Sequence, residues 1–434
     1  MPSETHPKIR IAIIGAGPGG LSSAIALSAL PDVDVRVYEK AGQLTELGGG
    51  ISVNHNGLKV LDLLGLRDAV RGAPTNPMVQ RNAYTGEIVD AGQPRDPDNV
   101  YEARRVRRAV LQRALAARVP VGLVGFGKKL VGLEDVGGEG VRVVFGDGTE
   151  TTVDLVVGAD GIRSLVRRHM YPDYTLSYAR QVGWRTLIPM GRLQHMPDLP
   201  LATTSWWYGK AKSFWLSPVD EPPHLLDLEF TARVFDEPPI PGRTVSWGIN
   251  VSNDDVSSRF PDVDPRLAEA FKQVPEGSWR EFASFEGPVV DSLAAWGKLA
   301  LVGDASHPSA GGFGAGSSFA MEDSWVLART IEYARSTSAS AKPSDIVREA
   351  LDTFNAVRRP FYQAMWRFRQ SQAKALKEVG RKDYEDFDGD LRQRFASDGL
   401  GAKRGKGFLS FVYDSDIGKT WTEFLEGDKL RRRG

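Results

Sequence analysis

Cysteine is absent from the 434 residues of this chain, and its absence excludes several kinds of chemistry. Disulfide bridges, cysteine nucleophiles and thiolate metal sites cannot form, and no cofactor can be attached covalently through sulfur. The lack of cysteine fits a reducing compartment, so we expect a cytoplasmic protein.

An excess of charge of either sign is also missing, because 55 lysines and arginines balance 55 aspartates and glutamates. A general nucleic-acid-binding protein needs a basic surface, so the composition argues against nucleic acid as a partner. The one marked basic run, Arg431, Arg432 and Arg433, is interpreted as a solvated tail.

Long uncharged stretches are rare, and the one from Ile11 to Leu30 resembles a signal peptide or membrane anchor. Four glycines and a proline interrupt it within residues 11–20, and its hydrophobic pattern changes there from strand-like to helix-like spacing. A strand–turn–helix unit of a soluble protein explains both features. We therefore predict no stable insertion into a membrane.

The interrupted stretch carries a G-x-G-x-x-G pattern made by Gly15, Gly17 and Gly20. Gly15 permits a tight turn, Gly17 lets the backbone approach a pyrophosphate, and Gly20 lets the helix pack close to the strand. Glu39 ends the next predicted strand, where a carboxylate can accept hydrogen bonds from ribose hydroxyls. The segment predicts a dinucleotide-binding unit; the alternative is a glycine turn beside an ordinary surface glutamate.

Two further motifs follow strands later in the chain. Asp160 lies in Gly158-Ala159-Asp160-Gly161, and Asp304 begins a segment that runs through His307. A carboxylate at a strand end can hold a ribityl hydroxyl, and a glycine loop at a helix start points N–H groups at a flavin, where reduction places negative charge. A purely structural turn is the alternative for each motif. The predicted loop residues are Gly314, Ala315, Gly316 and Ser317.

These three motifs, in this order, resemble the class A flavoprotein aromatic monooxygenases, the salicylate hydroxylase-like group, over about residues 9–425. The resemblance implies that Gly49 and Gly50, in the block Gly48-Gly49-Gly50-Ile51, lie near the flavin ring. It also implies that Arg108 contacts the ribityl–phosphate side. The strand from Trp184 to Pro189 resembles one on which fungal members of secondary metabolism carry a site arginine, here Arg185.

The resemblance implies an FAD-dependent monooxygenase. NADH or NADPH would reduce the flavin, O2 would add at its C4a atom, and the hydroperoxide would hydroxylate an aromatic or other electron-rich small molecule. Arg185 is the candidate for binding a substrate phenolate or carboxylate, with a structural ion pair as the alternative. His307 is a candidate for proton transfer, with a packing role as the alternative.

Other functions and substrates stay open at this point. An FAD-dependent oxidase or dehydrogenase could use the same scaffold without inserting oxygen, and a flavin-binding protein without catalysis is a third class. Aromatic polyketides, salicylate-like acids and indole alkaloids all remain possible substrates, and the oligomeric state is open.

The chain departs from the family pattern at two positions. Gly311 replaces a proline that usually follows the third motif, and Ser217 stands where dearomatising hydroxylases carry a tyrosine before a proline. The second difference puts dearomatisation of a phenol in doubt.

The predicted architecture is α/β, a Rossmann-type FAD-binding domain with an inserted antiparallel β-sheet domain and a C-terminal helical segment. Prolines and aromatic residues concentrate between about residues 174 and 290, which indicates the insertion. We predict a hairpin around Gly146-Asp147-Gly148 and a helix over residues 104–118. The predicted boundaries are 9–173 for the first part of the FAD-binding domain, 174–290 for the substrate domain, 291–345 for the return segment and 346–434 for the helical region and tail.

Overall fold

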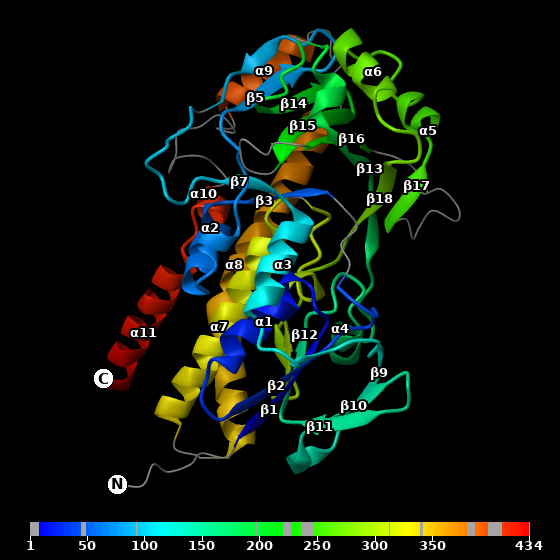
Figure 1. The fold of residues 1–434 in the computed structure, drawn as a ribbon. Coiled ribbons are helices and arrows are strands. Elements are labelled where there is room, and N and C mark those ends of the chain that lie inside the picture. The colour runs from blue at the N-terminus through cyan, green and yellow to red at the C-terminus, as the bar shows by residue number, and fades with distance from the viewer. Residues whose placement is uncertain are drawn as a thin grey trace.

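The computed structural model describes residues 8–44, 49–92, 94–196, 198–219, 227–235, 247–311, 313–338, 342–379, 387–397 and 410–433. Gly48 of the glycine block and Gly312 of the third motif lie outside these residues. A six-stranded sheet and an eight-stranded sheet form the two ends of the molecule, and helices connect them (Figure 1). The mixed α/β architecture agrees with the predicted fold class.

The six-stranded sheet has the order β19-β20-β12-β1-β2-β8, in which all neighbours run parallel except β19. Side chains of β1 alternate between two cores: Ile11 and Ile13 face one, and Ala12 and Ile14 face the other. The strands are β1 (Ile9–Ile14), β2 (Val33–Tyr38), β8 (Val124–Gly125), β12 (Leu155–Gly158), β19 (Ala294–Ala295) and β20 (Leu299–Leu301).

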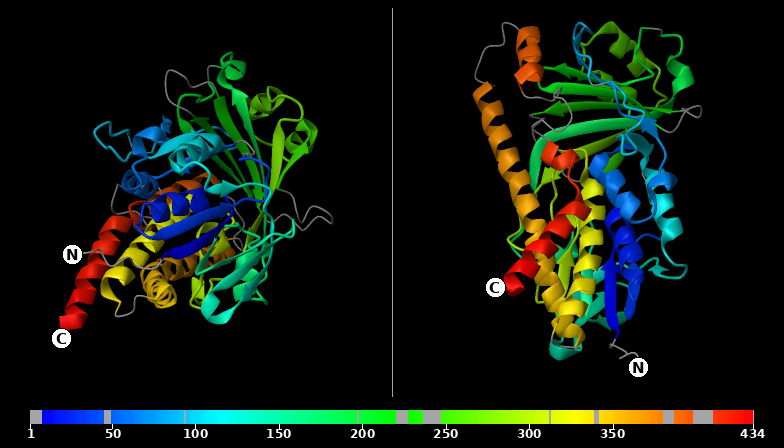
Figure 2. Two further views of the ribbon diagram at one scale, coloured as in Figure 1. Left: turned by 60° about the horizontal axis from the view of Figure 1, so that its bottom comes forward. Right: turned by 90° about the vertical axis from the view of Figure 1, so that its left-hand side faces the viewer.

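Helices cover one face of this sheet, and a small antiparallel sheet covers the other (Figures 1 and 2). The long helix α8 runs beside α7 and reaches the eight-stranded sheet, where Arg369 pairs with Glu286. The helices are α1 (Pro18–Ser28), α7 (Gly316–Thr337) and α8 (Pro343–Val379), and the strands are β9 (Leu130–Asp135), β10 (Val141–Phe145) and β11 (Glu150–Val153). Strands β10 and β11 form the predicted hairpin.

The eight-stranded sheet has the order β17-β18-β13-β16-β15-β14-β5-β6. Its aromatic core lies on the face covered by α5 (Asn253–Ser257) and α6 (Pro265–Lys272). The strands are β5 (Met78–Asn82), β6 (Ile88–Asp90), β13 (Ser177–Pro189), β14 (Thr204–Gly209), β15 (Lys212–Val219), β16 (Asp227–Phe235), β17 (Trp247–Val251) and β18 (Trp279–Glu286). Strands β5 and β6 come from the segment assigned to the first domain, so this sheet draws on two parts of the chain.

A fourth sheet, which has three strands in the order β3-β7-β4, lies between the two large ones. The predicted helix over residues 104–118 was too long, because Arg104–Arg107 form β7 and only Arg108–Arg118 form the helix α3. The cause is tertiary: β7 pairs with β3, residue Gly50 opposite Arg107, and this pairing overrides local helix propensity. The other two strands are β3 (Gly50–Val53) and β4 (Ala73–Pro74).

Short elements complete the fold. They are α2 (His55–Leu63), α4 (Leu165–Met170), α9 (Phe387–Ser397), α10 (Ser410–Tyr413), α11 (Ile417–Arg433) and the 3-10 turns η1 (Arg67–Ala69), η2 (Gly137–Glu139), η3 (Met190–Leu193) and η4 (Gly303–Ala305). The basic run at the C-terminus, interpreted as a tail, belongs to α11. Among the described helices, none is both long and apolar enough to cross a membrane.

Candidate active site

The sequence motifs meet at one edge of the six-stranded sheet. Strands β1, β2, β12 and β20 are parallel, so their carboxyl ends lie along the same edge. Gly15 follows β1, Glu39 follows β2, Asp160 follows β12 and Asp304 follows β20. Ligands of open α/β sheets bind at the carboxyl ends of the strands, and this edge is therefore the candidate site.

The three glycines of the first motif differ in what surrounds them. A Cβ atom at Gly15 would lie 2.5 Å from the carbonyl oxygen of Ala159, and the φ angle of +102° disfavours any side chain. A Cβ atom at Gly20 would lie 1.8 Å from the carbonyl oxygen of Gly15, whereas one at Gly17 would meet no atom within 4 Å. Gly15 and Gly20 thus serve the turn itself, and Gly17 leaves its surroundings open to a ligand.

Glu39 is oriented toward this turn by the backbone. One carboxylate oxygen accepts a hydrogen bond from the Ala16 N–H at 2.8 Å, and the other accepts one from the Ala41 N–H at 2.9 Å. Each oxygen keeps further acceptor capacity, because an ionised carboxylate has about four lone-pair sites. The carboxylate is therefore held at the end of β2 with capacity left for hydroxyl groups.

Asp160 caps the start of α4. One of its oxygens accepts hydrogen bonds from the N–H groups of Leu165 at 2.7 Å and Val166 at 3.2 Å. The other, Oδ1, is buried and has no hydrogen-bond partner among the described residues. Burial raises the pKa of Asp160. One oxygen of Asp160 therefore serves the start of α4, and the other is left without a partner among the described residues.

Arg167 links the second motif to the third, a role that the sequence did not reveal. Its Nη1 atom donates hydrogen bonds to the carbonyl oxygens of Asp304 at 3.1 Å and Ala305 at 2.8 Å. The guanidinium also lies 4.3 Å from the ring centre of Tyr174. Nothing in the sequence distinguishes Arg167 from its neighbours Arg163 and Arg168, since only the fold brings it to the later loop.

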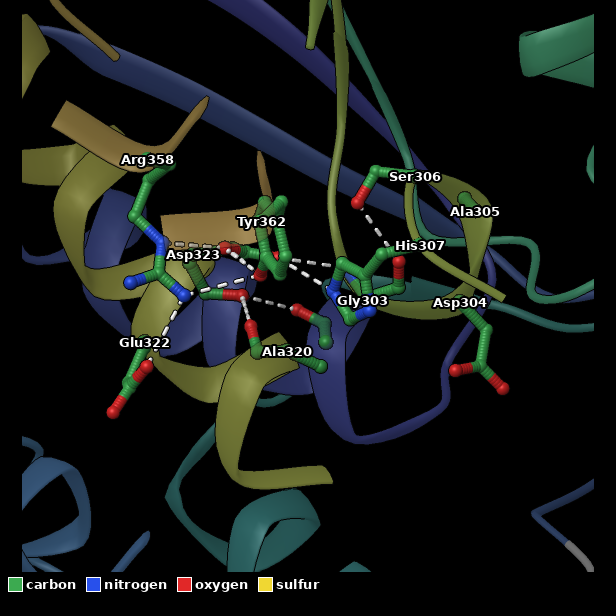
Figure 3. Close-up of polar contacts among 12 residues, drawn as sticks. Gly303, Asp304, Ala305, Ser306, His307, Ala320, Glu322, Asp323, Arg358 and Tyr362 are labelled. Atoms are coloured by element: carbon green, nitrogen blue, oxygen red, sulfur yellow. Dashed lines mark hydrogen bonds and ion pairs between the residues drawn. The ribbon is translucent and has the colours of Figure 1, made fainter. Parts of the chain in front are cut away.

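The third motif presents its carboxylate away from the protein interior. Asp304 is exposed, and its side chain points away from the buried residues behind the loop (Figure 3). Farther along the chain, Gly314 has a φ angle of +60°, and Ala315 is the N-cap of α7. The loop residues through Ser317 therefore open a 22-residue helix, whose N-terminus carries partial positive charge.

His307 lies in a buried ionic cluster. Its Nε2 atom is 3.3 Å from a carboxylate oxygen of Asp323, and its ring stacks on Tyr362 with 4.2 Å between centres. These contacts favour the packing interpretation of His307, because one nitrogen and one ring face are already engaged.

The structure brings Arg185, Arg108 and the glycine block together. Arg185 donates a hydrogen bond to the carbonyl oxygen of Gly50 at 2.7 Å, although the two residues are far apart in the chain. The backbone N–H of Arg108 donates to the carbonyl oxygen of Gly49 at 2.9 Å. Arg185 of the eight-stranded sheet thus contacts the segment expected beside the flavin.

Four aromatic residues of β14 and β15 divide between the two faces of the eight-stranded sheet. Trp207 and Phe214 belong to the core beneath α5 and α6. Trp206 and Trp215 are cross-strand partners on the opposite face, where their rings stack at 4.9 Å. The guanidinium of Arg105, on β7, lies 4.1 Å from the ring centre of Trp215. This face is therefore directed toward the sheet that contains β7.

Ser217, the residue in place of the family tyrosine, lies two positions beyond Trp215 on β15. It is fully buried, and its hydroxyl is 2.8 Å from that of Thr204. The hydroxyl is therefore engaged within the sheet.

Comparison with known proteins identifies the family. Residues 8–188 match the model of an FAD binding domain. The chain is 30% identical to the 3-amino-4-hydroxybenzoate 2-monooxygenase of Streptomyces cremeus over 79% of this chain and 82% of that protein. It is 29% identical to the 6-methylsalicylate 1-monooxygenase of Aspergillus terreus over 81% of this chain and 79% of that protein. A variant of HpxO from Klebsiella pneumoniae complexed with FAD has a similar structure, with a TM-score of 0.70, 25% identity and coverage of 89% and 94%.

The chain therefore belongs to the class A FAD-dependent aromatic monooxygenases, the salicylate hydroxylase-like group. It is an FAD-dependent monooxygenase that takes electrons from NAD(P)H and an oxygen atom from O2, and the alternative of an oxidase is not favoured. The residues at the sheet edge fit FAD, because Gly17 and Gly314 leave their surroundings open and Asp304 presents an outward carboxylate.

Proposed function

We propose that this monooxygenase hydroxylates a small hydroxylated aromatic acid on the sheet face that carries Trp206 and Trp215. The observation that carries the proposal is the presence of two guanidinium groups beside Trp215, that of Arg105 at 4.1 Å and that of Arg185 at 6.0 Å from its ring centre. Guanidinium groups stay charged and bind carboxylates or phenolates in bidentate fashion. The indole offers an aromatic surface, and its buried Nε1 has no hydrogen-bond partner among the described residues.

The names of the two relatives support an aromatic acid. One acts on 3-amino-4-hydroxybenzoate and the other on 6-methylsalicylate, and both compounds carry a ring hydroxyl and a carboxylate. Two fixed guanidinium groups beside an aromatic surface suit that combination better than a neutral polycyclic compound. The fungal relatives of this kind also support a place in secondary metabolism.

We infer that FAD lies along the carboxyl edge of the six-stranded sheet, with its ADP half against the first motif and Glu39. Its flavin end would lie toward Asp304 and the start of α7, where the helix N-terminus favours negative charge. Bound FAD supplies the oxygen-inserting chemistry, and the chain supplies binding, orientation and electrostatics. The residues proposed to hold FAD are Gly15, Gly17, Gly20, Glu39, Gly49, Gly50, Arg108, Asp160, Asp304, Gly314, Ala315, Gly316 and Ser317.

The domain division belongs to the same proposal. Residues 9–173 and 291–345 would form the FAD-binding domain and residues 174–290 the substrate domain, to which β5 and β6 add two strands. The absence of cysteine and the balanced charge support a cytoplasmic protein without a nucleic-acid partner.

A substrate panel tests the proposed activity. Purified holoenzyme is mixed with hydroxybenzoates, with their neutral methyl esters, and with indole and polyketide aromatics. Oxidation of NADH or NADPH is followed, and products made under ¹⁸O2 are analysed by mass. We expect hydroxybenzoates to stimulate NAD(P)H oxidation and to gain one labelled oxygen atom. Substrate-dependent H2O2 formation without NAD(P)H would show an oxidase and contradict the proposal.

Arg185 is tested with a matched arginine on the opposite sheet face. Arg185→Ala should raise KM for an anionic substrate by roughly 10- to 100-fold, as expected for loss of a hydrogen bond to a charged group. KM for the neutral methyl ester should change much less. Arg259, which lies over Trp184 on the other face, provides the control, and Arg259→Ala should leave both KM values unchanged. An equal rise in KM for the acid and for the ester in Arg185→Ala would contradict an ionic contact between Arg185 and the substrate.

A further inference from the structure

Two neighbouring acidic residues of α7 lie in a buried cluster beneath the third motif (Figure 3). Glu322 and Asp323 are each at most 1% exposed, and both bind Arg358 of α8, which is 2% exposed. Arg358 lies 3.1 Å from Glu322 and 2.7 Å from Asp323. Two buried carboxyl groups thus share one arginine. Because burying charged groups costs desolvation energy, such a cluster is weak evidence for a purely stabilising role.

The two oxygens of Asp323 have different partners. Oδ1 accepts hydrogen bonds from Arg358 Nε at 2.7 Å and from the Tyr362 hydroxyl at 2.6 Å, both on α8. Oδ2 accepts one from the backbone N–H of Gly303 at 2.9 Å and lies 3.3 Å from Nε2 of His307. One oxygen therefore anchors the carboxylate in the helices, and the other holds the loop.

Glu322 is also an acidic side chain, is equally buried and has the same arginine partner, but its hydrogen bonds do not reach this loop. Its remaining hydrogen bonds come from Asn56 at 3.1 Å and Ser415 at 3.2 Å. Glu322 is thus a suitable control for Asp323, because its carboxyl group is buried in the same cluster but does not bind the third motif.

Asp304 lies between the two loop residues that Asp323 holds. Gly303 precedes it and His307 follows it, while Arg167 donates a hydrogen bond to the carbonyl oxygen of Asp304 itself. Gly303 is also pressed against α7, because a Cβ atom there would lie 2.8 Å from that of Ala320. The backbone around Asp304 is thereby held in place, while its side chain points outward (Figure 3).

We propose that Asp323 is a positioning residue for FAD: its carboxylate, oriented by Arg358 and Tyr362, holds the Gly303–His307 loop so that Asp304 meets the cofactor. His307 contributes to the same positioning, because its Nε2 atom connects the loop to the Asp323 carboxylate. The inference rests on the proposed placement of Asp304 against FAD and adds the residues that maintain this placement.

The affinity of the FAD-free protein for FAD, measured by quenching of flavin fluorescence, tests the proposal without reference to activity. Asp323→Asn replaces one acceptor oxygen by a donor, so either the loop or the α8 anchor loses its partner. We expect its Kd for FAD to rise by roughly 10- to 100-fold, the loss of hydrogen bonds to a charged group. Glu322→Gln should change Kd by less than threefold. Equal Kd values for both variants would overturn the proposal.

Variants of His307 decide the question if Asp323→Asn does not fold. His307→Ala removes the donor to Asp323 and should weaken FAD binding, whereas His307→Gln keeps an N–H near the position of Nε2 and should restore most of the affinity. Failure of His307→Gln to restore more affinity than His307→Ala would contradict the positioning role.

Asp304→Ala separates this inference from the proposed FAD site. If Asp304→Ala weakens FAD binding and Asp323→Asn does not, the site stands and the positioning role is refuted. If Asp304→Ala leaves the affinity unchanged, the placement of Asp304 against FAD fails and the inference fails with it.

Discussion

The different surroundings of Gly17 and Gly20 predict that substitution by alanine will weaken cofactor binding at the first position and lower stability at the second. In Gly20→Ala the new Cβ atom would lie 1.8 Å from the Gly15 carbonyl oxygen, and real Cβ atoms do not approach within 3.0 Å. The turn must open to relieve this backbone clash, which also strains the hydrogen bond from Gly15 N–H to the Tyr38 carbonyl. Overpacking typically costs 1–3 kcal/mol, and we expect about 3 kcal/mol here because backbone has to move.

In Gly17→Ala the added methyl group meets no protein atom within 4 Å, and the backbone angles of φ −74° and ψ −177° suit alanine. The free energy of unfolding should therefore stay within about 0.5 kcal/mol of the wild type or rise slightly. FAD affinity should fall by about tenfold or more, because the methyl group lies where we place the pyrophosphate.

Urea denaturation of the FAD-free protein and FAD titration measure these two quantities separately. Gly138→Ala is the control, because Gly138 lies in η2 and a Cβ atom there also meets nothing within 4 Å. It should change neither quantity. Wild-type FAD affinity in Gly17→Ala would refute the placement of the cofactor, and wild-type stability in Gly20→Ala would refute the close packing of the turn.

Three further predictions follow from single residues. Asp160→Ala should lower the free energy of unfolding by about 1 kcal/mol, and Asp160→Asn by less, because an amide oxygen can still cap α4; equal losses in urea denaturation would contradict this. Trp207→Ala should lower the free energy of unfolding by about 3–5 kcal/mol, because Trp207 is fully buried in the core. Trp206→Ala should lower it less and should instead raise KM for the substrate. A larger loss of stability in Trp206→Ala than in Trp207→Ala would contradict the assignment of the two faces. Burial raises the pKa of Glu322, so its contribution to stability is full below pH 4.5 and is lost as pH rises through the folded-state pKa. Glu322→Gln should reduce the loss of unfolding free energy as pH rises above 4.5. An unchanged pH dependence would show that Glu322 does not cause this loss.

The convergence of the motifs could be predicted because it depends on local patterns and one general rule. Glycine spacing and the change of hydrophobic period locate the turn after β1, and Glu39 marks the end of β2. Once the strands are known to be parallel, their carboxyl ends must share an edge, so Asp160 and Asp304 are brought to the same place. No long-range contact had to be guessed for this part of the site.

Contacts between distant segments could not be predicted. Arg185 meets Gly50 across 135 positions, and Arg167 meets Ala305 across 138. The segment from Arg104 to Arg107 was assigned to a helix because its partner strand is not visible locally. The sequence also could not show that Asp323 holds His307, since the two residues meet only after α7 folds back against the loop.

The register of β14 and β15 separates the proposed substrate-binding face of the eight-stranded sheet from the face that packs in the core. Trp206 and Trp207 are adjacent in sequence, yet strand alternation directs one toward the sheet that contains β7 and the other into the core beneath α6. Across the hairpin, Trp215 and Phe214 divide in the same way. If substrate binds as proposed, substitutions on the face of Trp206 and Trp215 should change what the enzyme recognises, while the aromatic core on the other face keeps the sheet intact. Because a one-residue slip would exchange the two faces, the register is required for folding and, in the proposed site, for specificity as well.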